Sequence, residues 1–258
     1  MDTIKRMLNR DINMLWERLE NKQNEWCNLN LNLNTKSYED LYNQHYYLLK
    51  YYPAYFTEYY HIWKIFFETY NKKHINILSI GCGAGIDFIA FTHILRIKNL
   101  KYQYFGIDSI EWKDRNRVFD FTQQEVQNLT KKDFENVDLI VFPKILTELE
   151  NEELENLADK IINSYITDDV FNRNKVEGID KFQIICEKLK YKGYKLVSTK
   201  CEEFEAISNR EQGLRSEYSF FVYPDEIMSN FKKIKGESPI LNNKYIAYNI
   251  LKFVKNDN

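Results

Sequence analysis

The sequence predicts an α/β protein with a doubly wound, mostly parallel sheet, and three observations support that class. Short apolar runs alternate with helical patterns from residue 75 onward, as in chains of strand–helix–strand units. The first of these runs, 75–80, leads directly into a cluster of glycines, which is typical of a buried parallel strand and its turn. Residues 1–72 instead show helical periodicity, which predicts a separate helical N-terminal cap.

The N-terminal cap reads as helices joined by a linker. Apolar residues recur at helical spacing over 4–19, and the alternating Asn and Leu residues at 28–35 interrupt that pattern. Ser37, followed by acidic residues, predicts the start of the next helix. Pro53 predicts a break that separates helices at 38–51 and 54–71.

Residues 73–258 read as one sheet domain. The expected strands are 75–80, 102–108, 118–122, 137–142, 166–171, 194–199 and 245–254, and the expected helices are 86–97, 148–165 and 179–192. Residues 202–240 look like an insertion before the last strand.

Composition excludes several classes of protein. Lys and Arg number 36 against 38 Asp and Glu, for a net charge of −2 over 258 residues, which argues against a surface built throughout for nucleic acid. The four cysteines are scattered and no histidines have metal-ligand spacing, so neither a metal site nor a disulfide framework is expected. We expect no signal peptide and no membrane span, and hence a cytoplasmic protein. These patterns do not set the oligomeric state.

The spacing of the glycines in the glycine-rich turn limits the classes of ligand that it can bind. Gly81, Gly83 and Gly85 lie two residues apart between an apolar strand and an apolar helix. Glycines let a ligand approach the backbone, and the helix N-terminus adds free N–H donors. A dinucleotide site would need its third glycine three residues after the second, and that position is Ile86. A pyrophosphate cradle is therefore the poorer fit.

An acidic residue follows at the tip of the second predicted strand. Asp108 lies about twenty residues beyond the glycines, where a carboxylate can accept hydrogen bonds from both hydroxyls of a ribose. Strand, glycine loop, helix, strand and terminal Asp in this order resemble the class I S-adenosylmethionine-dependent methyltransferases over about residues 75–200. The resemblance implies a seven-stranded Rossmann-like sheet, S-adenosylmethionine as cofactor and S-adenosylhomocysteine as product.

The resemblance also implies a set of cofactor-binding residues. In it the glycines would pack under the methionine and adenosine parts of the cofactor, Asp108 would hold the ribose, and Glu125, beside Gln124, would lie near the adenine. Many members carry an acid at the position of Ser79, so that contact is either absent here or supplied by another residue. The full set of expected residues is Ser79, Gly81, Cys82, Gly83, Gly85, Asp108, Ser109, Glu125 and Phe142.

The acceptor side is expected after the fourth strand, between Phe142 and Glu148, because ligands of such sheets lie at the carboxyl ends of the strands. Methyl transfer depends mainly on positioning and needs one base or none. Glu148 is the candidate: it could act as a base or bind a cationic acceptor, or it could be a solvated residue in the first turn of the next helix. Lys144 reads as a surface charge or a substrate-steering residue. The segment lacks the Asn/Asp-Pro-Pro-Tyr/Phe signature of many amino-methylating enzymes.

Two further features leave alternatives open. The many aromatic residues between 42 and 70 could pack the helices on the sheet, or some could cover the cofactor or stack on a planar or cationic acceptor. The lysines at 188–200 could form a solvated face or contact nucleic acid. We expect a methyltransferase for a small-molecule or peptide acceptor, with an RNA methyltransferase and a non-catalytic S-adenosylmethionine-binding protein as alternatives.

Overall fold

The fold is built on one sheet. The computed structural model describes residues 2–20, 38–96, 98, 100–115, 118–161, 165–171, 175–205, 221–235 and 245–255. Within these residues the strands are β1 (His74–Ile80), β2 (Lys101–Asp108), β3 (Asp120–Gln123), β4 (Leu139–Pro143), β5 (Tyr165–Phe171), β6 (Tyr194–Glu205) and β7 (Tyr245–Lys255). They lie in the order β3-β2-β1-β4-β5-β7-β6.

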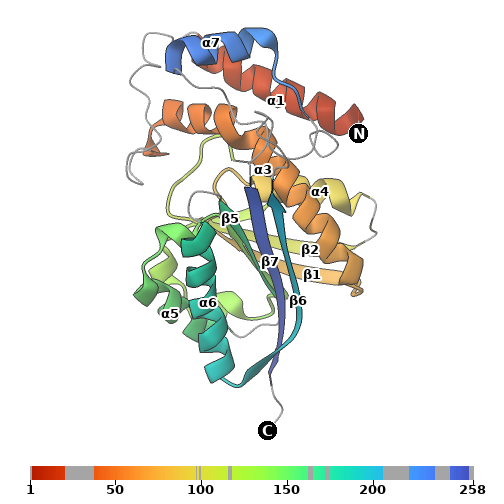
Figure 1. Cartoon of the computed structure of the whole chain (residues 1–258), viewed down its shortest axis with the longest axis vertical. Coiled ribbons are helices and arrows are strands. Elements are labelled where there is room, and N and C mark those ends of the chain that lie inside the picture. Colours follow the sequence, from red (N-terminus) through yellow and green to blue (C-terminus); the bar gives the residue numbers. More distant parts are fainter. Residues whose placement is uncertain are drawn as a thin grey trace.

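Helices cover both faces of the sheet. They are α1 (Asp2–Glu20), α3 (Leu41–Thr69), α4 (Ile86–Leu95), α5 (Asn151–Lys160), α6 (Lys175–Tyr191) and α7 (Asp225–Lys235), with short 3₁₀ turns η2 (Val126–Asn128), η3 (Lys131–Phe134) and η4 (Leu146–Glu148). Figure 1 shows α5 and α6 together on one side of the sheet, α3 and α4 on the other, and α1 beside α7 at one end of the molecule.

Strand periodicity divides the apolar residues between two cores. Successive side chains of a strand point to opposite faces. In β4, Leu139 and Val141 therefore join the cluster formed with α1, α3, α4 and α7, whereas Ile140 and Phe142 join the cluster formed with α5 and α6. The N-terminal helices thus share a hydrophobic core with one face of the sheet.

The predicted α/β class with a parallel sheet is confirmed. β1 pairs in parallel with β2 and β4, β2 with β3, and β4 with β5, while β7 pairs antiparallel with both β5 and β6. The third strand begins two residues later than expected because Val118 lies in a turn and is 78% exposed. The helix expected over 148–165 is α5, which spans only Asn151–Lys160.

The predicted break at Pro53 is wrong, because α3 continues from Leu41 to Thr69 with Pro53 inside it. Proline has no N–H to donate to the carbonyl four residues earlier, which normally disfavours a helix interior. Here the hydroxyl of Tyr223 donates to the backbone oxygen of that residue, Leu49, at 2.6 Å. A side chain distant in sequence therefore replaces the missing helical donor, and the buried aromatic residues on both sides keep the helix continuous.

The start of α3 also differs from the prediction. Its N-cap is Asp40 rather than Ser37, and the Asp40 side chain accepts a hydrogen bond from the backbone N–H of Asn43 at 2.9 Å. An aspartate is an equally good cap. The linker predicted at 28–35 lies outside the described residues, as do 206–220 and 236–240 of the predicted insertion; 202–205 belongs to β6, and 221–235 contains α7. No helix in the described part of the chain is long and apolar enough to cross a membrane.

Candidate functional site

A cavity lies where the strand order reverses. β1 pairs with β2 on one side and with β4 on the other, and ligands of doubly wound sheets bind at this kind of switch point, beyond the carboxyl ends of the strands. The empty space in and at the mouth of the cavity is about 750 Å³, a value that includes space open to solvent. Its lining residues are Tyr38, Tyr47, Tyr55, Tyr59, Gly81, Cys82, Gly83, Ala84, Ile86, Asp87, Asp108, Ser109, Ile110, Trp112, Pro143, Lys144, Ile145 and Glu148.

The glycine loop forms one wall of this cavity, and its three glycines have different neighbours. All three have φ values of +54° to +76°, a region that side chains rarely adopt. A Cβ on Gly85 would lie 2.5 Å from the Phe119 ring, and one on Gly81 would lie 2.6 Å from Ile145. A Cβ on Gly83 would lie 3.7 Å from the Trp112 ring, which is an ordinary van der Waals contact. Gly85 therefore serves packing and does not line the cavity, whereas Gly81 and Gly83 do line it.

Asp108 is fixed at the end of β2 by backbone donors. Its Oδ2 accepts a hydrogen bond from the Gly83 N–H at 2.8 Å, and its Oδ1 accepts one from the Ile110 N–H at 2.9 Å. Desolvation raises the pKa of this carboxyl, although these two bonds and one from the Trp112 side chain oppose the rise. Each carboxylate oxygen has a further lone pair, so Asp108 can still accept from a bound ligand.

A second carboxylate, Asp87, was not singled out by the sequence. It lies in the first turn of α4, is 1% exposed, and lines the cavity. Its Oδ2 accepts a hydrogen bond from Ser79 Oγ at 2.9 Å and a short one from the Tyr104 hydroxyl. Burial raises its pKa to about 6, although both hydrogen bonds oppose the rise. Its Oδ1 makes no hydrogen bond within the described part of the chain.

The structure brings only some of the expected cofactor residues to the cavity. The expected residues that line it are Gly81, Cys82, Gly83, Asp108 and Ser109. Ser79 and Phe142 are fully buried and point into the protein, Ser79 toward Asp87. Glu125 is exposed and precedes η2 outside the lining, although its charge contributes to the raised pKa of Asp108. Desolvation likewise raises the pKa of Cys82 well above its ordinary value, so this thiol stays protonated near neutral pH.

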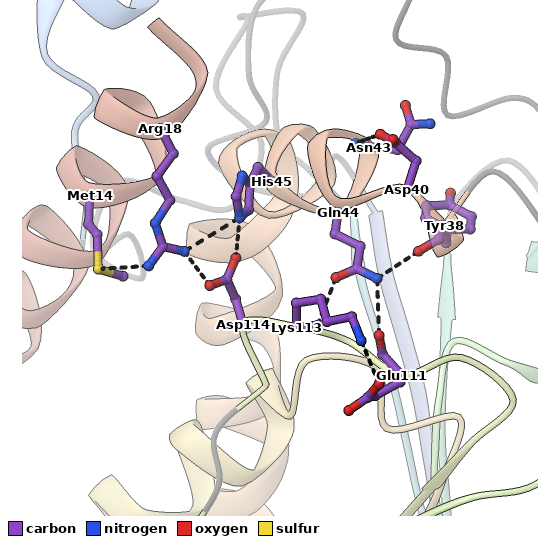
Figure 2. Close-up of polar contacts among 10 residues, drawn as sticks. All are labelled: Met14, Arg18, Tyr38, Asp40, Asn43, Gln44, His45, Glu111, Lys113 and Asp114. Atoms are coloured by element: carbon purple, nitrogen blue, oxygen red, sulfur yellow. Dashed lines mark hydrogen bonds and ion pairs between the residues drawn. The ribbon is translucent and has the colours of Figure 1, made fainter. Parts of the chain in front are cut away.

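The loop after Asp108 is tied to α3 by a buried glutamine. Gln44 is fully buried, and its amide nitrogen donates to the backbone oxygens of Tyr38, at 2.7 Å, and Glu111, at 3.2 Å. Its amide oxygen accepts from the Lys113 N–H at 2.8 Å. Figure 2 shows Gln44 between these segments. One side chain thus places Tyr38 and the Trp112-bearing loop against each other at the cavity.

A charged cluster joins the same loop to α1. Asp114 Oδ2 lies 2.5 Å from His45 Nε2, and Arg18 makes a short contact with Asp114 Oδ1 (Figure 2). Burial alone would raise the pKa of Asp114, but the bonds to His45 and Arg18 outweigh it and lower that pKa. The cluster connects α1, α3 and the loop in one place.

Lys144 does not lie on the surface, so its interpretation as a surface charge is wrong. Its ammonium group is 2.7 Å from Glu58 Oε2, and the two side chains are 10% and 0% exposed. It also lies 4.7 Å from the centre of the Tyr55 ring, a cation–π distance. The backbone of Lys144 has φ +65°, which turns the chain sharply after β4 and directs this residue toward α3.

Glu148 lines the cavity and is itself exposed to solvent. It ends η4, three residues before α5, whose N-cap is Glu150 in a capping box with Glu153. The interpretation of Glu148 as a residue of the α5 first turn is therefore wrong, although its expected exposure to solvent is confirmed. Desolvation raises the pKa of the Glu148 carboxyl, and the charge of Asp108 raises it further. Its carboxylate has no hydrogen-bond or ion-pair partner among the described residues.

A lysine of α6 holds the backbone around Glu148. Lys181 Nζ donates to the carbonyl oxygens of Thr147, at 3.2 Å, and Leu149, at 2.6 Å. These are the two neighbours of Glu148 in sequence. The carboxylate is therefore presented from a fixed backbone segment.

The packing interpretation of the aromatic helix is confirmed at one end of α3, whereas a role in covering the cofactor or stacking on an acceptor stays a prediction for the other end. Trp63 and Phe67 pack on Phe91 of α4 at centroid distances of 4.9 and 6.0 Å, so this end of α3 is core. At the other end, Tyr47 and the preceding Tyr38 form a cluster with Trp112, at 5.2 and 5.8 Å. Figure 1 shows that the long α3 runs from one end of the molecule to the sheet, so its two ends have different neighbours.

Two of the C-terminal lysines have structural roles. Lys192 donates to the carbonyl oxygens of Ala158, Asp159 and Ile161 at 2.8–2.9 Å, which satisfies the C-terminus of α5. Lys188 lies 3.5 Å from Asp159 and 3.7 Å from Glu155. Across the described residues, no group of His, Cys, Asp and Glu side chains could hold a metal ion.

Comparisons with known proteins give structural likenesses only. No protein-family model and no curated protein matches the chain. Among solved structures, it is similar to an S-adenosylmethionine-dependent methyltransferase from Archaeoglobus fulgidus, with 18% identity, coverage of 76% of this chain and 92% of that one, and a TM-score of 0.45. It is also similar to the plantazolicin methyltransferase BpumL in complex with S-adenosylhomocysteine, with 17% identity, coverage of 95% of this chain and 99% of that one, and a TM-score of 0.48. A third similar structure is the CurJ carbon methyltransferase, with 10% identity, coverage of 77% of this chain and 54% of that one, and a TM-score of 0.42. Because these TM-scores lie below 0.5, the proposal below depends on the chain's own residues.

Proposed function

We propose that this chain is an S-adenosylmethionine-dependent methyltransferase that acts on a small-molecule or peptide acceptor. The observation that carries the proposal is the Asp108 carboxylate, which two backbone N–H groups fix beside Gly83 in a cavity at the sheet's switch point. This is the position at which a carboxylate can bind both hydroxyls of a ribose. The proposed fold is the seven-stranded Rossmann-like sheet, with residues 1–72 as its cap.

The residues of the cavity fit the parts of the cofactor. Gly83 lines the cavity beside the Trp112 ring, and Asp108 suits the ribose. The Oδ1 atom of Asp87, buried without a hydrogen bond in the described chain, suits the ammonium group of the methionine part. Asp87 thereby supplies the acid that the family carries at the position of Ser79, and Ser79 holds it in place. We call Gly81, Gly83, Asp87 and Asp108 the cofactor side.

Five further residues of the cavity define an acceptor side, namely Tyr38, Tyr47, Tyr55, Lys144 and Glu148. Bound S-adenosylmethionine supplies a methyl group on a positively charged sulfur. The protein has to exclude water and hold the acceptor near that carbon, and the buried tyrosines of α3 supply such walls. The ion-paired and helix-capping roles of Lys188 and Lys192 favour a small-molecule or peptide acceptor over RNA. The scattered cysteines fit a cytoplasmic enzyme.

Calorimetric titration with S-adenosylmethionine and S-adenosylhomocysteine tests the proposal. Both should bind the wild-type protein, and Asp108→Ala should weaken both about 100-fold, because it removes two hydrogen bonds to a charged group. The matched control is Asp120→Ala, an exposed aspartate of the neighbouring strand β3, which should leave both affinities unchanged. If neither compound binds the wild-type protein, the proposed function is wrong. Tight binding together with no methylated product from any amine, alcohol or peptide would favour a non-catalytic binding protein.

A further inference from the structure

The cavity wall already accommodates one ammonium group, that of Lys144. This group lies 2.7 Å from the Glu58 carboxylate and over the face of the Tyr55 ring. A carboxylate together with an aromatic face is the combination that stabilises a cation away from bulk water. The contacts of Lys144 therefore show that a carboxylate and an aromatic ring of this wall can hold an ammonium group.

A carboxylate and aromatic rings also line the cavity at Glu148, a residue exposed to solvent, and no cationic side chain among the described residues is paired with it. Glu148 lies close enough to Tyr38 and Tyr47 that its charge contributes, after desolvation, to their raised pKa values. The Trp112 ring contacts both tyrosines. Lys144 is the one cationic side chain among the described lining residues, and it is paired with Glu58 instead.

The remaining carboxylates of the cavity have other roles under the proposed function. Asp108 is assigned to the ribose, and Asp87 to the ammonium group of the methionine part. Tyr38 and Tyr47 stay protonated and neutral because burial raises their pKa values. Glu148 is thus the negative charge left for the acceptor.

We propose that the methyl acceptor is an aliphatic amine, bound as its ammonium ion by the Glu148 carboxylate against the rings of Tyr38, Tyr47 and Trp112. The inference rests on the proposed function and names its substrate class. Before transfer, the ammonium gives one proton to Glu148, which passes it to solvent. The freed lone pair then forms the new nitrogen–carbon bond while the carbon–sulfur bond breaks and leaves its electron pair on sulfur. The methylated nitrogen now carries the positive charge and leaves as a secondary ammonium ion, which stays protonated near neutral pH.

Binding of small probes to the protein saturated with S-adenosylhomocysteine tests this inference without turnover. The probes share one phenyl group: 2-phenylethylammonium, 2-phenylethanol and 3-phenylpropionate, each titrated by ligand-observed nuclear magnetic resonance. The ammonium probe should bind most tightly, and Glu148→Gln should weaken it about tenfold, because a charged hydrogen bond is lost. The alcohol should bind equally to both proteins. The control Glu152→Gln, an exposed carboxylate in the first turn of α5, should change nothing.

The outcomes separate the two proposals. Failure of S-adenosylhomocysteine to bind the wild-type protein overturns the proposed function and this inference with it. If S-adenosylhomocysteine binds normally but 3-phenylpropionate binds more tightly than the ammonium probe, this inference is overturned and the proposed function stands. An ammonium affinity that Glu148→Gln leaves unchanged overturns it as well.

Discussion

The two sides of the cavity are held together by different kinds of contact. On the cofactor side, Asp108 is fixed by backbone N–H groups of Gly83 and Ile110, which belong to the turns at the ends of neighbouring parallel strands. On the acceptor side, side chains bridge elements far apart in sequence, as Lys144 does with Glu58. The comparison suggests that the cofactor side is a property of the sheet, whereas the acceptor side depends on how α3 docks.

The largest effect is expected at the buried ion pair of the acceptor side. Glu58→Gln leaves the Lys144 ammonium buried without its counter-charge, so the free energy of unfolding should fall by about 3–5 kcal/mol. Urea denaturation measures this change. The double variant Glu58→Gln with Lys144→Met removes both charges and should recover most of the loss. A single-variant cost below about 1 kcal/mol, the usual value of a surface pair, would show that α3 docks without this contact.

A smaller effect on stability is expected from Gln44, which connects α3 to the loop after β2. Gln44→Leu leaves the backbone groups of Tyr38, Glu111 and Lys113 without their partner, which should cost about 2 kcal/mol of stability. Since the same loop carries Ile110 and Trp112, affinity for S-adenosylhomocysteine should also fall about tenfold.

The control for Gln44 is Asp114→Asn, which weakens the contact of the same loop with Arg18 and His45. It should lower stability and leave the affinity for S-adenosylhomocysteine within about twofold. Equal losses of affinity in both variants would mean that Gln44 only docks the loop and does not position the residues around Asp108.

The smallest effect is expected within α3 itself. Tyr223→Phe removes the donor to the Leu49 carbonyl and should cost about 1 kcal/mol in thermal or urea unfolding. In a Pro53→Ala background, the restored helical N–H can reach that carbonyl, so the same substitution should cost less. An equal cost in both backgrounds would contradict the role of Tyr223 as a replacement donor.

The contrast between the two sides also explains how far the sequence could predict the site. The glycine loop and Asp108 are local signals, because each follows a strand within a few residues and parallel strands bring them to one edge. Even there, the sequence could not show that Gly85 packs against Phe119, or that the Asp87 carboxylate accepts a hydrogen bond from Ser79 at the cavity. Those depend on which way side chains point after the strands pair.

The acceptor side carried no comparable local signal. Lys144 and Glu58 lie in segments with no shared motif, and Pro53 suggested a break in the helix that bears Glu58 and Tyr55. The donor that makes a continuous α3 possible, Tyr223, comes from the far end of the chain. Glu148 and Lys144 were each anticipated as one of several alternatives because they follow a strand at the expected edge of the sheet, and the aromatic residues between 42 and 70 were anticipated only as a group.

The division of the cavity can be tested by measuring the affinity of S-adenosylhomocysteine for Asp108→Ala and Glu148→Gln under the same conditions as for the wild type. We expect a loss of about 100-fold for Asp108→Ala and a change below about twofold for Glu148→Gln. Equal losses in the two variants, or a loss confined to Glu148→Gln, would contradict the assignment of Asp108 to the cofactor and Glu148 to the acceptor.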